Sequence, residues 1–176
     1  MVMKVCELIL AFLMILHLSC KEDNKTSSDS STSQQRIIQA NFKSFIDISW
    51  NEKNVDTLSH VLAKNYFCNH NGIRVAGDRN EMQAFMKTYF IGFPDARFAT
   101  DATQIKDNRL FTNWTFKGTN TGAFRQIPAT GKKIKITGYA TVYFNGDGEI
   151  VQEDIYFNEL EFLQQLGYTL TPPILK

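Results

Sequence analysis

The C-terminal part of the chain alternates in polarity in a way that predicts a strand followed by a short helix. From Gly148 to Gly167 the sequence reads GEIVQEDIYFNELEFLQQLG. Side chains along a strand point to opposite faces with a period of two. One face therefore carries Ile150, Gln152, Asp154, Tyr156 and Asn158, and the other carries Val151, Glu153, Ile155 and Phe157. The first face is mainly polar and aromatic, so it predicts a reactive site if it lines a cavity and an ordinary sheet surface if it faces water.

Helical periodicity dominates the earlier part of the chain. Apolar residues recur at three- and four-residue steps from Ile38 to Trp50, which predicts an amphipathic helix. A second, shorter helix is expected from Val55 to Lys64, with Asn54 as its N-cap. Asp78 and Glu81 form a capping-box pattern and predict the start of a third helix.

The other segments predict β-structure. Two short strands joined by a turn are expected at Tyr66 to His70 and Ile73 to Val75. Longer runs rich in Thr, Ile, Val and aromatic residues extend over Arg97 to Ile105, Arg109 to Lys117, Lys133 to Asn145 and Glu149 to Phe157. Short turns join several of these runs, so the paired strands must be antiparallel. Helices followed by such a meander predict an α+β fold with the helices on one side of a curved sheet.

An apolar run near the N-terminus predicts a targeting signal. It extends from Leu8 to Leu16, about the length of a signal-peptide core and too short to span a bilayer. It is followed by His17-Leu18-Ser19-Cys20, which resembles a bacterial lipoprotein cleavage site. Residues 1–19 are therefore a predicted lipoprotein signal peptide, Cys20 the lipidated residue and 20–33 a disordered tether. The protein would then be held to a membrane outside the cytoplasm through its lipid alone; an uncleaved anchor or a non-lipid signal is the alternative.

Composition narrows the classes of function. The net charge is +1 and no basic run occurs, so nothing indicates a nucleic-acid partner. With Cys6 removed and Cys20 lipidated, Cys68 is left without a disulfide partner, and a buried thiol is its expected state. No metal-ligand spacing, nucleotide-binding loop or Ser-His-Asp arrangement is present, so no cofactor is predicted. The 14 phenylalanines predict a core or pocket with large flat walls.

Several segments match a known family in the right order. They are GTNTGAFRQIPATGKKI from Gly118 to Ile134, His70 on its short strand, GFPDARF from Gly92 to Phe98, and the C-terminal stretch quoted above. On these motifs the domain 34–176 resembles the SnoaL-like polyketide and ester cyclases of the nuclear-transport-factor-2-like superfamily. The resemblance implies a cone of curved sheet and three helices around a pocket, and a homodimer formed through the outer face of the sheet.

The resemblance also implies a reaction. In the cyclases that name the family, an aspartate on the last long strand removes an α-proton from a polyketide ester, and a donor stabilises the enolate. His70 matches the donor position. Asn158 stands where the aspartate is usual, and an amide cannot act as a base. Asp154, on the same face of the strand, is therefore the candidate base, and Asp154 and His70 are the catalytic candidates.

The substrate-binding candidates follow from the same resemblance. They are Trp50 and Asn51 at the end of the first helix, Trp114 on the central strand, Asn120 in the signature loop, and Tyr156 and Asn158 on the last strand. Alternatives stay open for several of them. Helix capping explains Asn158 with Glu161. Asp154 can be a solvated surface carboxylate and His70 a structural residue.

Two functions from different classes remain. The first is a cofactor-free cyclase, isomerase or lyase acting on a small carbonyl compound. The second is a lipid-anchored protein that binds a small apolar ligand and performs no chemistry. Asp154 and His70 facing one closed cavity would support the enzyme. If Asp154 points to bulk water, the enzymatic reading requires another base.

Overall fold

The computed structural model describes the backbone of residues 23–172 and the side chains of residues 32–172. The predicted signal peptide 1–19 and the lipidation site Cys20 lie outside this part of the chain. Within the residues described, no helix is both long and apolar enough to cross a membrane. The chain divides into two units, Met1–Gln34 and Gln35–Lys176, and the second unit carries the folded domain.

The first helix is longer than its apolar periodicity indicates. Helix α2 covers Asp23–Ser44 and continues as a π-helical turn, η2, over Phe45–Asn51. The helix predicted from Ile38 to Trp50 is confirmed, but it starts earlier and overlaps the segment 20–33, where a disordered tether was expected. Once a helix is nucleated, each further residue adds one hydrogen bond, so it can extend into a segment without an apolar face.

The second predicted helix is shorter than expected. A 3₁₀ turn, η3 (Val55–Thr57), leads into a single helical turn, α3 (Leu58–Val61), in place of the helix predicted over Val55 to Lys64. The chain turns into strand β1 (Leu62–His70) because the first residue of that strand already pairs with the last strand of the sheet. Asn54 is a cap, as predicted, and its side chain accepts a hydrogen bond from the second residue of η3.

The hairpin and the third helix agree with their sequence signals. Strand β2 (Ile73–Ala76) pairs with β1 in antiparallel orientation, and helix α4 covers Arg79–Gly92. Asp78 caps α4 by accepting a hydrogen bond from the backbone N–H of Glu81 at 2.8 Å. The Glu81 carboxylate accepts one in return from the N–H of Gly77 at 2.7 Å. These bonds satisfy donors at the helix start that have no partner within the helix.

The sheet is a mixed one, and it is antiparallel except at one pair. Its remaining strands are β3 (Arg97–Thr100), β4 (Gln104–Lys106), β5 (Arg109–Thr119), β6 (Lys133–Phe144) and β7 (Ile150–Phe157). The strand order is β2-β1-β7-β6-β5-β3, with β4 also pairing with β5, and only β1 and β7 run parallel. The run predicted from Arg97 to Ile105 is therefore two strands. Asp107 and Asn108 have φ of 50° and 55°, as a tight hairpin turn requires.

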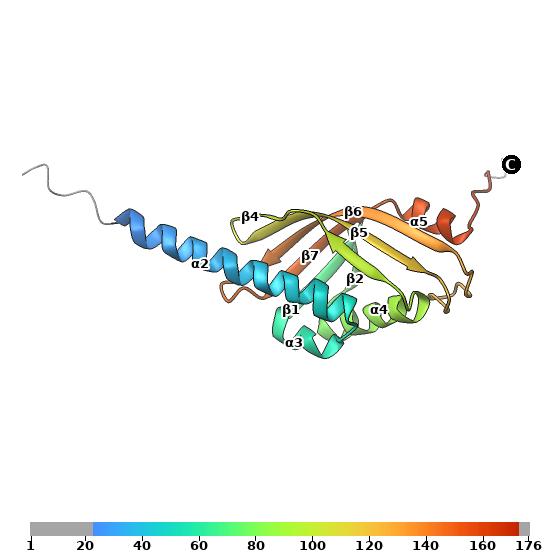
Figure 1. Cartoon of the computed structure of the whole chain (residues 1–176), viewed down its shortest axis with the longest axis horizontal. Coiled ribbons are helices and arrows are strands. Elements are labelled where there is room, and N and C mark those ends of the chain that lie inside the picture. Colours follow the sequence, from blue (N-terminus) through green and yellow to red (C-terminus); the bar gives the residue numbers. More distant parts are fainter. Residues whose placement is uncertain (1–22, 173–176) are drawn as a thin grey trace, which may run out of the picture. The chain divides into compact units, whose positions relative to one another are not determined.

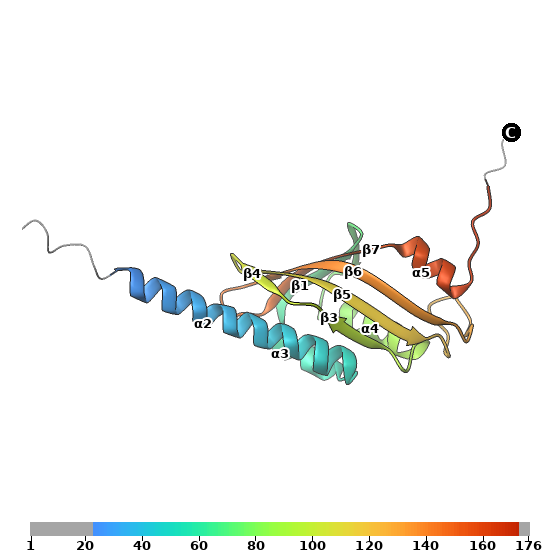
Figure 2. The same cartoon turned by 45° about the horizontal axis from the view of Figure 1, so that its top comes forward.

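The helices cover one face of the curved sheet, which confirms the predicted α+β fold (Figure 1). Helices α3 and α4 lie on that face, and Figure 2 shows the same arrangement from a second direction. The short helix α5 (Glu159–Leu166) packs against β6 near its start. The hydrophobic core lies between the layers and joins Phe42 and Phe45 of the first helix to Met82 and Met86 of α4. The face of the sheet that meets this core is called the inner face below.

Candidate active site

A cavity lies between the inner face of the sheet and the helices. It measures about 80 Å³ in terms of the positions that the centre of a water molecule can take. That is room for roughly five to eight waters, and the pocket is only partly enclosed. Most of its walls are aromatic and aliphatic side chains from α2, η2, α4 and the sheet. Such an enclosure resembles the apolar pockets that hold small ligands.

Strand register arranges the sheet side of the cavity in rows. The first row holds Cys68 and Glu153, paired across β1 and β7. The second row crosses four strands and consists of His70, Ile155, Ala140 and Thr112. The third row consists of Phe157, Gly138 and Trp114. Residues two apart on a strand share a face, so these rows face the same cavity.

Glu153 is the charged group that the structure places in this cavity. Its side chain is 5% exposed, and the hydroxyl of Tyr66 donates a hydrogen bond to Oε1 at 2.5 Å. Among the residues described, no other hydrogen bond to this carboxylate is present. Burial raises the pKa of Glu153 to about 7, although the Tyr66 hydrogen bond lowers it in part. Glu153 is therefore poised to accept or release a proton at neutral pH.

Asp154 does not line the cavity, which corrects the prediction of the catalytic base. Register shifts where β6 pairs with β7, so that Tyr143 pairs with Gln152 while Phe144 pairs with Ile150. This bulge absorbs one residue, and Ile150 joins Glu153 on the inner face instead of sharing the face of Asp154. From Gln152 onward the residues alternate between the two faces as predicted. The face that meets the cavity, however, is the one that carries Glu153 and not the one that carries Asp154.

On the outer face, Asp154 belongs to a polar network. Its carboxylate accepts hydrogen bonds from Asn69 and Gln152, both at 2.8 Å. The side chain of Asn69 in turn accepts a hydrogen bond from Arg74 at 3.1 Å. These partners hold Asp154 as a surface carboxylate between neighbouring strands. They account for the residue without a catalytic role.

His70 lies in the cavity as predicted. Its ring makes edge-to-face contacts with Phe85 and Phe157, at 5.1 and 5.6 Å between ring centroids. Burial, with a smaller effect from the Arg125 charge, lowers the pKa of His70 to about 4. The imidazole is therefore neutral at pH 7 and presents one N–H donor and one acceptor. In the part of the chain described, neither ring nitrogen has a hydrogen-bond partner, so both are available to a ligand.

The two tryptophans also line the cavity, as predicted. The π-helical turn η2 carries Trp50 inward, where it packs against Phe98 at 4.6 Å between centroids. Trp114 lies across Gly138, where any added Cβ would overlap the indole. The indole N–H of Trp114 is buried and has no hydrogen-bond partner among the described residues. It is a second donor that a ligand could satisfy.

Asn120 is a structural residue of the signature loop rather than a cavity residue. Its side chain donates hydrogen bonds to the carbonyls of Gly92 and Gly122 at 3.1 and 2.8 Å. Its oxygen accepts hydrogen bonds from the N–H and the hydroxyl of Thr130, both at 2.9 Å. Asn120 therefore fastens both ends of the loop to the end of α4.

Three other predicted binding residues also lie outside the cavity. The amide of Asn51 exchanges two hydrogen bonds with the backbone of Phe98, at 3.0 and 2.8 Å, and holds η2 against β3. Asn158 is the N-cap of α5 and accepts a hydrogen bond from the N–H of Glu161 at 3.0 Å, so the capping alternative holds. Tyr156 is 49% exposed on the outer face.

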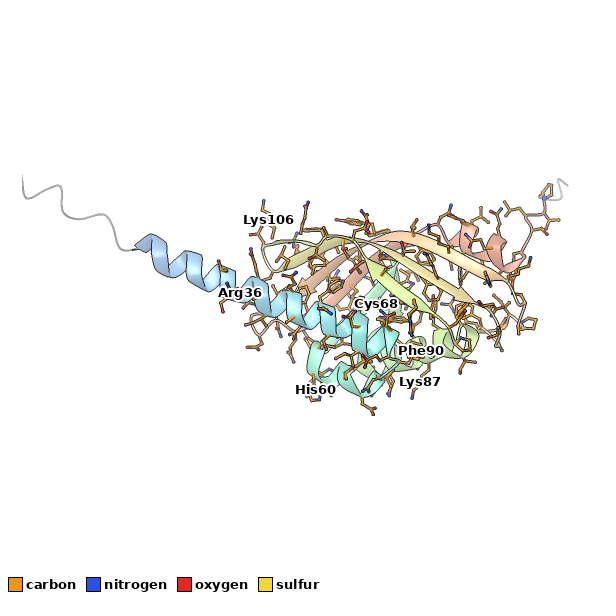
Figure 3. All side chains as sticks on the ribbon, in the orientation of Figure 1. Arg36, His60, Cys68, Lys87, Phe90 and Lys106 are labelled. Carbon is orange, nitrogen blue, oxygen red and sulfur yellow. The ribbon has the colours of Figure 1, made fainter. Side chains whose placement is uncertain are left out.

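Cys68 is a buried thiol, 1% exposed, as expected for a cysteine without a disulfide partner. Figure 3 shows it in the interior of the domain, whereas His60 and Lys87 project from the helical side. Burial raises the pKa of the Cys68 thiol, and the nearby Glu153 carboxylate adds to this effect. In the described part of the chain, no three His, Cys, Asp or Glu side chains come together in a way that could hold a metal ion.

Comparison with known families agrees with the geometry. The family model of the SnoaL-like polyketide cyclases matches residues 40–166, which is most of the chain. The chain belongs to this family. Among curated proteins, no sequence matches it.

Several solved structures share the fold. A SnoaL-like polyketide cyclase family protein from Jannaschia sp. CCS1 superposes with a TM-score of 0.68 at 14% identity, covering 78% of this chain and 94% of that chain. TsrD from Streptomyces laurentii reaches 0.66 at 21% identity, with coverage of 75% and 96%. AclR from Streptomyces galilaeus, named as a hydroxylase, reaches 0.60 at 16% identity, with coverage of 83% and 85%. These superpositions establish the nuclear-transport-factor-2-like fold. At such low sequence identities they leave the reaction open.

Glu153 is the cavity carboxylate that sequence reasoning missed, although a signal for it was present. It is the one charged residue on a strand face that otherwise holds Val151, Ile155 and Phe157. A charged residue on an apolar face is more informative than one on a polar face, because its burial has to be compensated. The polar face drew attention to Asp154 instead.

Proposed function

We propose that this SnoaL-like protein is a cofactor-free acid–base enzyme that removes a proton next to a carbonyl group of a small, largely apolar compound. Glu153 is the base, and the observation that supports it is a single carboxylate buried in an apolar cavity with a pKa of about 7. The family places such chemistry on an aspartate further along the same strand, where this chain has Asn158. Glu153 supplies the missing base from the inner face.

The positions of Glu153 and His70 suit one reaction centre. They lie in adjacent rows on paired strands, since Glu153 is aligned with Cys68 and His70 with Ile155. Two residues along a strand and one strand across correspond to Cα atoms about 8 Å apart. That separation leaves room between the two side chains for a carbonyl group and its α-carbon.

The roles follow from the protonation states. The carboxylate of Glu153 takes the proton from the α-carbon, and the C–H electron pair forms the enolate. The N–H of the neutral His70 donates a hydrogen bond to the enolate oxygen, as an oxyanion donor does. Tyr66 holds one carboxylate oxygen, so the other remains for the proton. Glu153 then returns the proton to carbon in an isomerisation. In a cyclisation the enolate carbon attacks a second carbonyl, whose C=O π electrons move to oxygen, and Glu153 returns the proton to the alkoxide so formed.

Deuterium exchange tests the proposal without knowledge of the natural substrate. A bicyclic ketone with an activated methylene, 2-tetralone, is incubated in D₂O with the protein, and incorporation is followed by NMR. The wild type should accelerate exchange, and Glu153→Gln should reduce the acceleration by a factor on the order of 10²–10⁴, the usual contribution of general-base catalysis. Asp154→Asn removes a carboxylate from the other face of the same strand. This variant should accelerate deuterium exchange of the ketone as much as the wild type does.

Two outcomes contradict this assignment. If Glu153→Gln exchanges as fast as the wild type, Glu153 is not the base. If the wild type binds 2-tetralone but causes no exchange, the non-catalytic reading, in which the pocket only binds a small apolar ligand, replaces the enzymatic one.

The membrane anchor and the dimer remain proposals of their own. We propose that Cys20 is acylated and holds the protein at a membrane outside the cytoplasm. Mass spectrometry of the mature N-terminus tests this, and the acyl modification should be lost in Cys20→Ala.

We also propose a homodimer through the outer face of the sheet. Tyr139 and Tyr156, directly paired in register, are 41% and 49% exposed there and support it. Analytical ultracentrifugation of Tyr139→Asp, with a wild-type reference, tests the contact.

A further inference from the structure

At one end of the cavity several lining residues are only half-buried. His70, Phe85, Trp114 and Phe157 are partly exposed. Toward the other end, Cys68 and Glu153 are buried to 1% and 5% exposure. Ring contacts join His70 to Phe85 and to Phe157, so the half-buried residues form a continuous rim. A ligand that entered over this rim would reach Glu153 at the buried end.

Arg125 is held over this rim by a tight turn. Phe124 and Ile127 exchange two backbone hydrogen bonds of 2.9 Å each, and both side chains are buried, so the turn is fixed at its ends. Arg125 has a φ of 54°, a conformation that residues with a side chain rarely adopt. Its guanidinium carbon lies 5.9 Å from the centre of the Phe85 ring and 5.4 Å from that of Phe124.

The charge of Arg125 has no acidic partner among the described residues. The two ion pairs in the described part of the chain are formed by Lys43 and by Arg79. Its field reaches the cavity, because the Arg125 charge lowers the pKa of both His70 and Tyr89. Glu159 acts on Tyr89 in the opposite direction, but it forms no ion pair with Arg125 in this structure. The rim thus presents a positive charge without an ion-pair partner beside apolar walls.

We propose that the ligand of this pocket is an amphipathic anion whose ring system enters the cavity while its carboxylate stays at the rim and binds Arg125. The inference rests on the proposed function, since it orients the substrate with its carbonyl toward Glu153 and His70. A carboxylate suits the site because the guanidinium binds it through two parallel hydrogen bonds. Cation–π contacts with Phe85 and Phe124 keep the guanidinium beside the apolar walls of the pocket. The substrate class is a cyclic or aromatic keto acid.

A matched pair of probes separates the charge from the ring system. Binding of 2-naphthoate and of 2-naphthamide, which have the same shape and differ in charge, is measured by isothermal titration calorimetry at low salt. The wild type should prefer 2-naphthoate. Arg125→Gln should weaken 2-naphthoate binding on the order of fivefold, the scale of an exposed ion pair, and change 2-naphthamide binding by less than twofold. The preference should also shrink in 0.5 M salt, since exposed charges are screened.

Lys106→Gln is the control for the change in net charge. Lys106 lies at the end of β4 and pairs with the first residue of β5, whereas Arg125 follows the end of β5, so the length of that strand separates them. This variant should bind both probes like the wild type. The proposal is overturned if Arg125→Gln leaves the preference intact, if it weakens both probes equally, or if 2-naphthoate does not bind the wild type at millimolar concentration.

Failure of this proposal is distinguishable from failure of the proposed function. The calorimetric preference requires no turnover, and in Glu153→Gln it should persist because Arg125 is unchanged. Loss of the preference with intact deuterium exchange removes only the anionic ligand class. A retained preference without exchange leaves a pocket that binds carboxylates but performs no proton transfer.

Discussion

Two titratable groups of the cavity wall, the acid Glu153 and the base His70, should make the folding stability depend on pH in opposite directions, so that their effects mask each other in the wild type. Burial raises the pKa of Glu153 from 4.5 to about 7. Between these values the folded protein binds more protons than the unfolded chain, so the free energy of unfolding falls as the pH rises. The difference between 4.5 and about 7, at 1.36 kcal/mol per pH unit, corresponds to about 3 kcal/mol.

His70 acts in the opposite direction. Burial lowers its pKa from 6.5 to about 4, so between these values the unfolded chain binds more protons than the folded protein. The free energy of unfolding therefore rises with pH, again by about 3 kcal/mol over the whole interval from about 4 to 6.5. From pH 4.5 to 6.5 the two effects nearly cancel.

Single substitutions should expose each effect. Glu153→Gln lacks the decrease in stability that Glu153 contributes between pH 4.5 and 7. Its free energy of unfolding, relative to that of the wild type, should therefore increase by about 3 kcal/mol over this interval. In His70→Gln it should decrease by a similar amount between pH 4 and 6.5. Urea denaturation at a series of pH values measures both, provided the m-values agree.

Asp154→Asn is the matched control for Glu153→Gln. It removes the neighbouring carboxylate and leaves Glu153 in place, so the decrease between pH 4.5 and 7 that Glu153 contributes should remain. Profiles of Glu153→Gln and His70→Gln that run parallel to that of the wild type would falsify the assigned burial of both groups.

Three further substitutions test the surroundings of the cavity. Tyr66→Phe removes the hydrogen bond that lowers the pKa of Glu153, so the pH profile of deuterium exchange should shift to higher pH. Gly138→Ala forces a methyl group into the indole that lies over it and should cost about 1–3 kcal/mol in urea denaturation. Gly146→Ala, where nothing lies within 4 Å, is its neutral control. Asn120→Ala removes four side-chain hydrogen bonds of the signature loop and should lower stability by about 2 kcal/mol or more; unchanged thermal unfolding would refute its loop role.

Local signals in the sequence predicted most of the fold. The capping pair Asp78 and Glu81 and the turn at Asp107 and Asn108 depend on nearby residues alone, and both appear in the structure as predicted. The end of the helix predicted from Val55 to Lys64 could not be placed in this way. There, pairing of β1 with a strand almost ninety positions later overrides the helical pattern, and such pairing is invisible in a local window.

The candidate site was predicted only in part, for a physical reason of the same kind. His70, Trp50 and Trp114 lie in the cavity as predicted. The face of the last strand that meets the cavity was predicted wrongly, because alternation tells which residues share a face but not which face is covered by helices. The bulge between Gln152 and Ile150 also moves Ile150 from the predicted face of the strand to the opposite face. Its position depends on how β7 pairs with β6, which the sequence of β7 alone does not show.

The central claim is that Glu153 titrates near neutrality inside the cavity, and ¹³C NMR of carboxyl-labelled glutamate tests it most directly. The wild type should show one glutamate carboxyl signal with a midpoint of about pH 7. That signal should be absent in Glu153→Gln and unchanged in Asp154→Asn. A spectrum in which every glutamate signal titrates near the ordinary value, with the same set of midpoints in Glu153→Gln, would contradict the account.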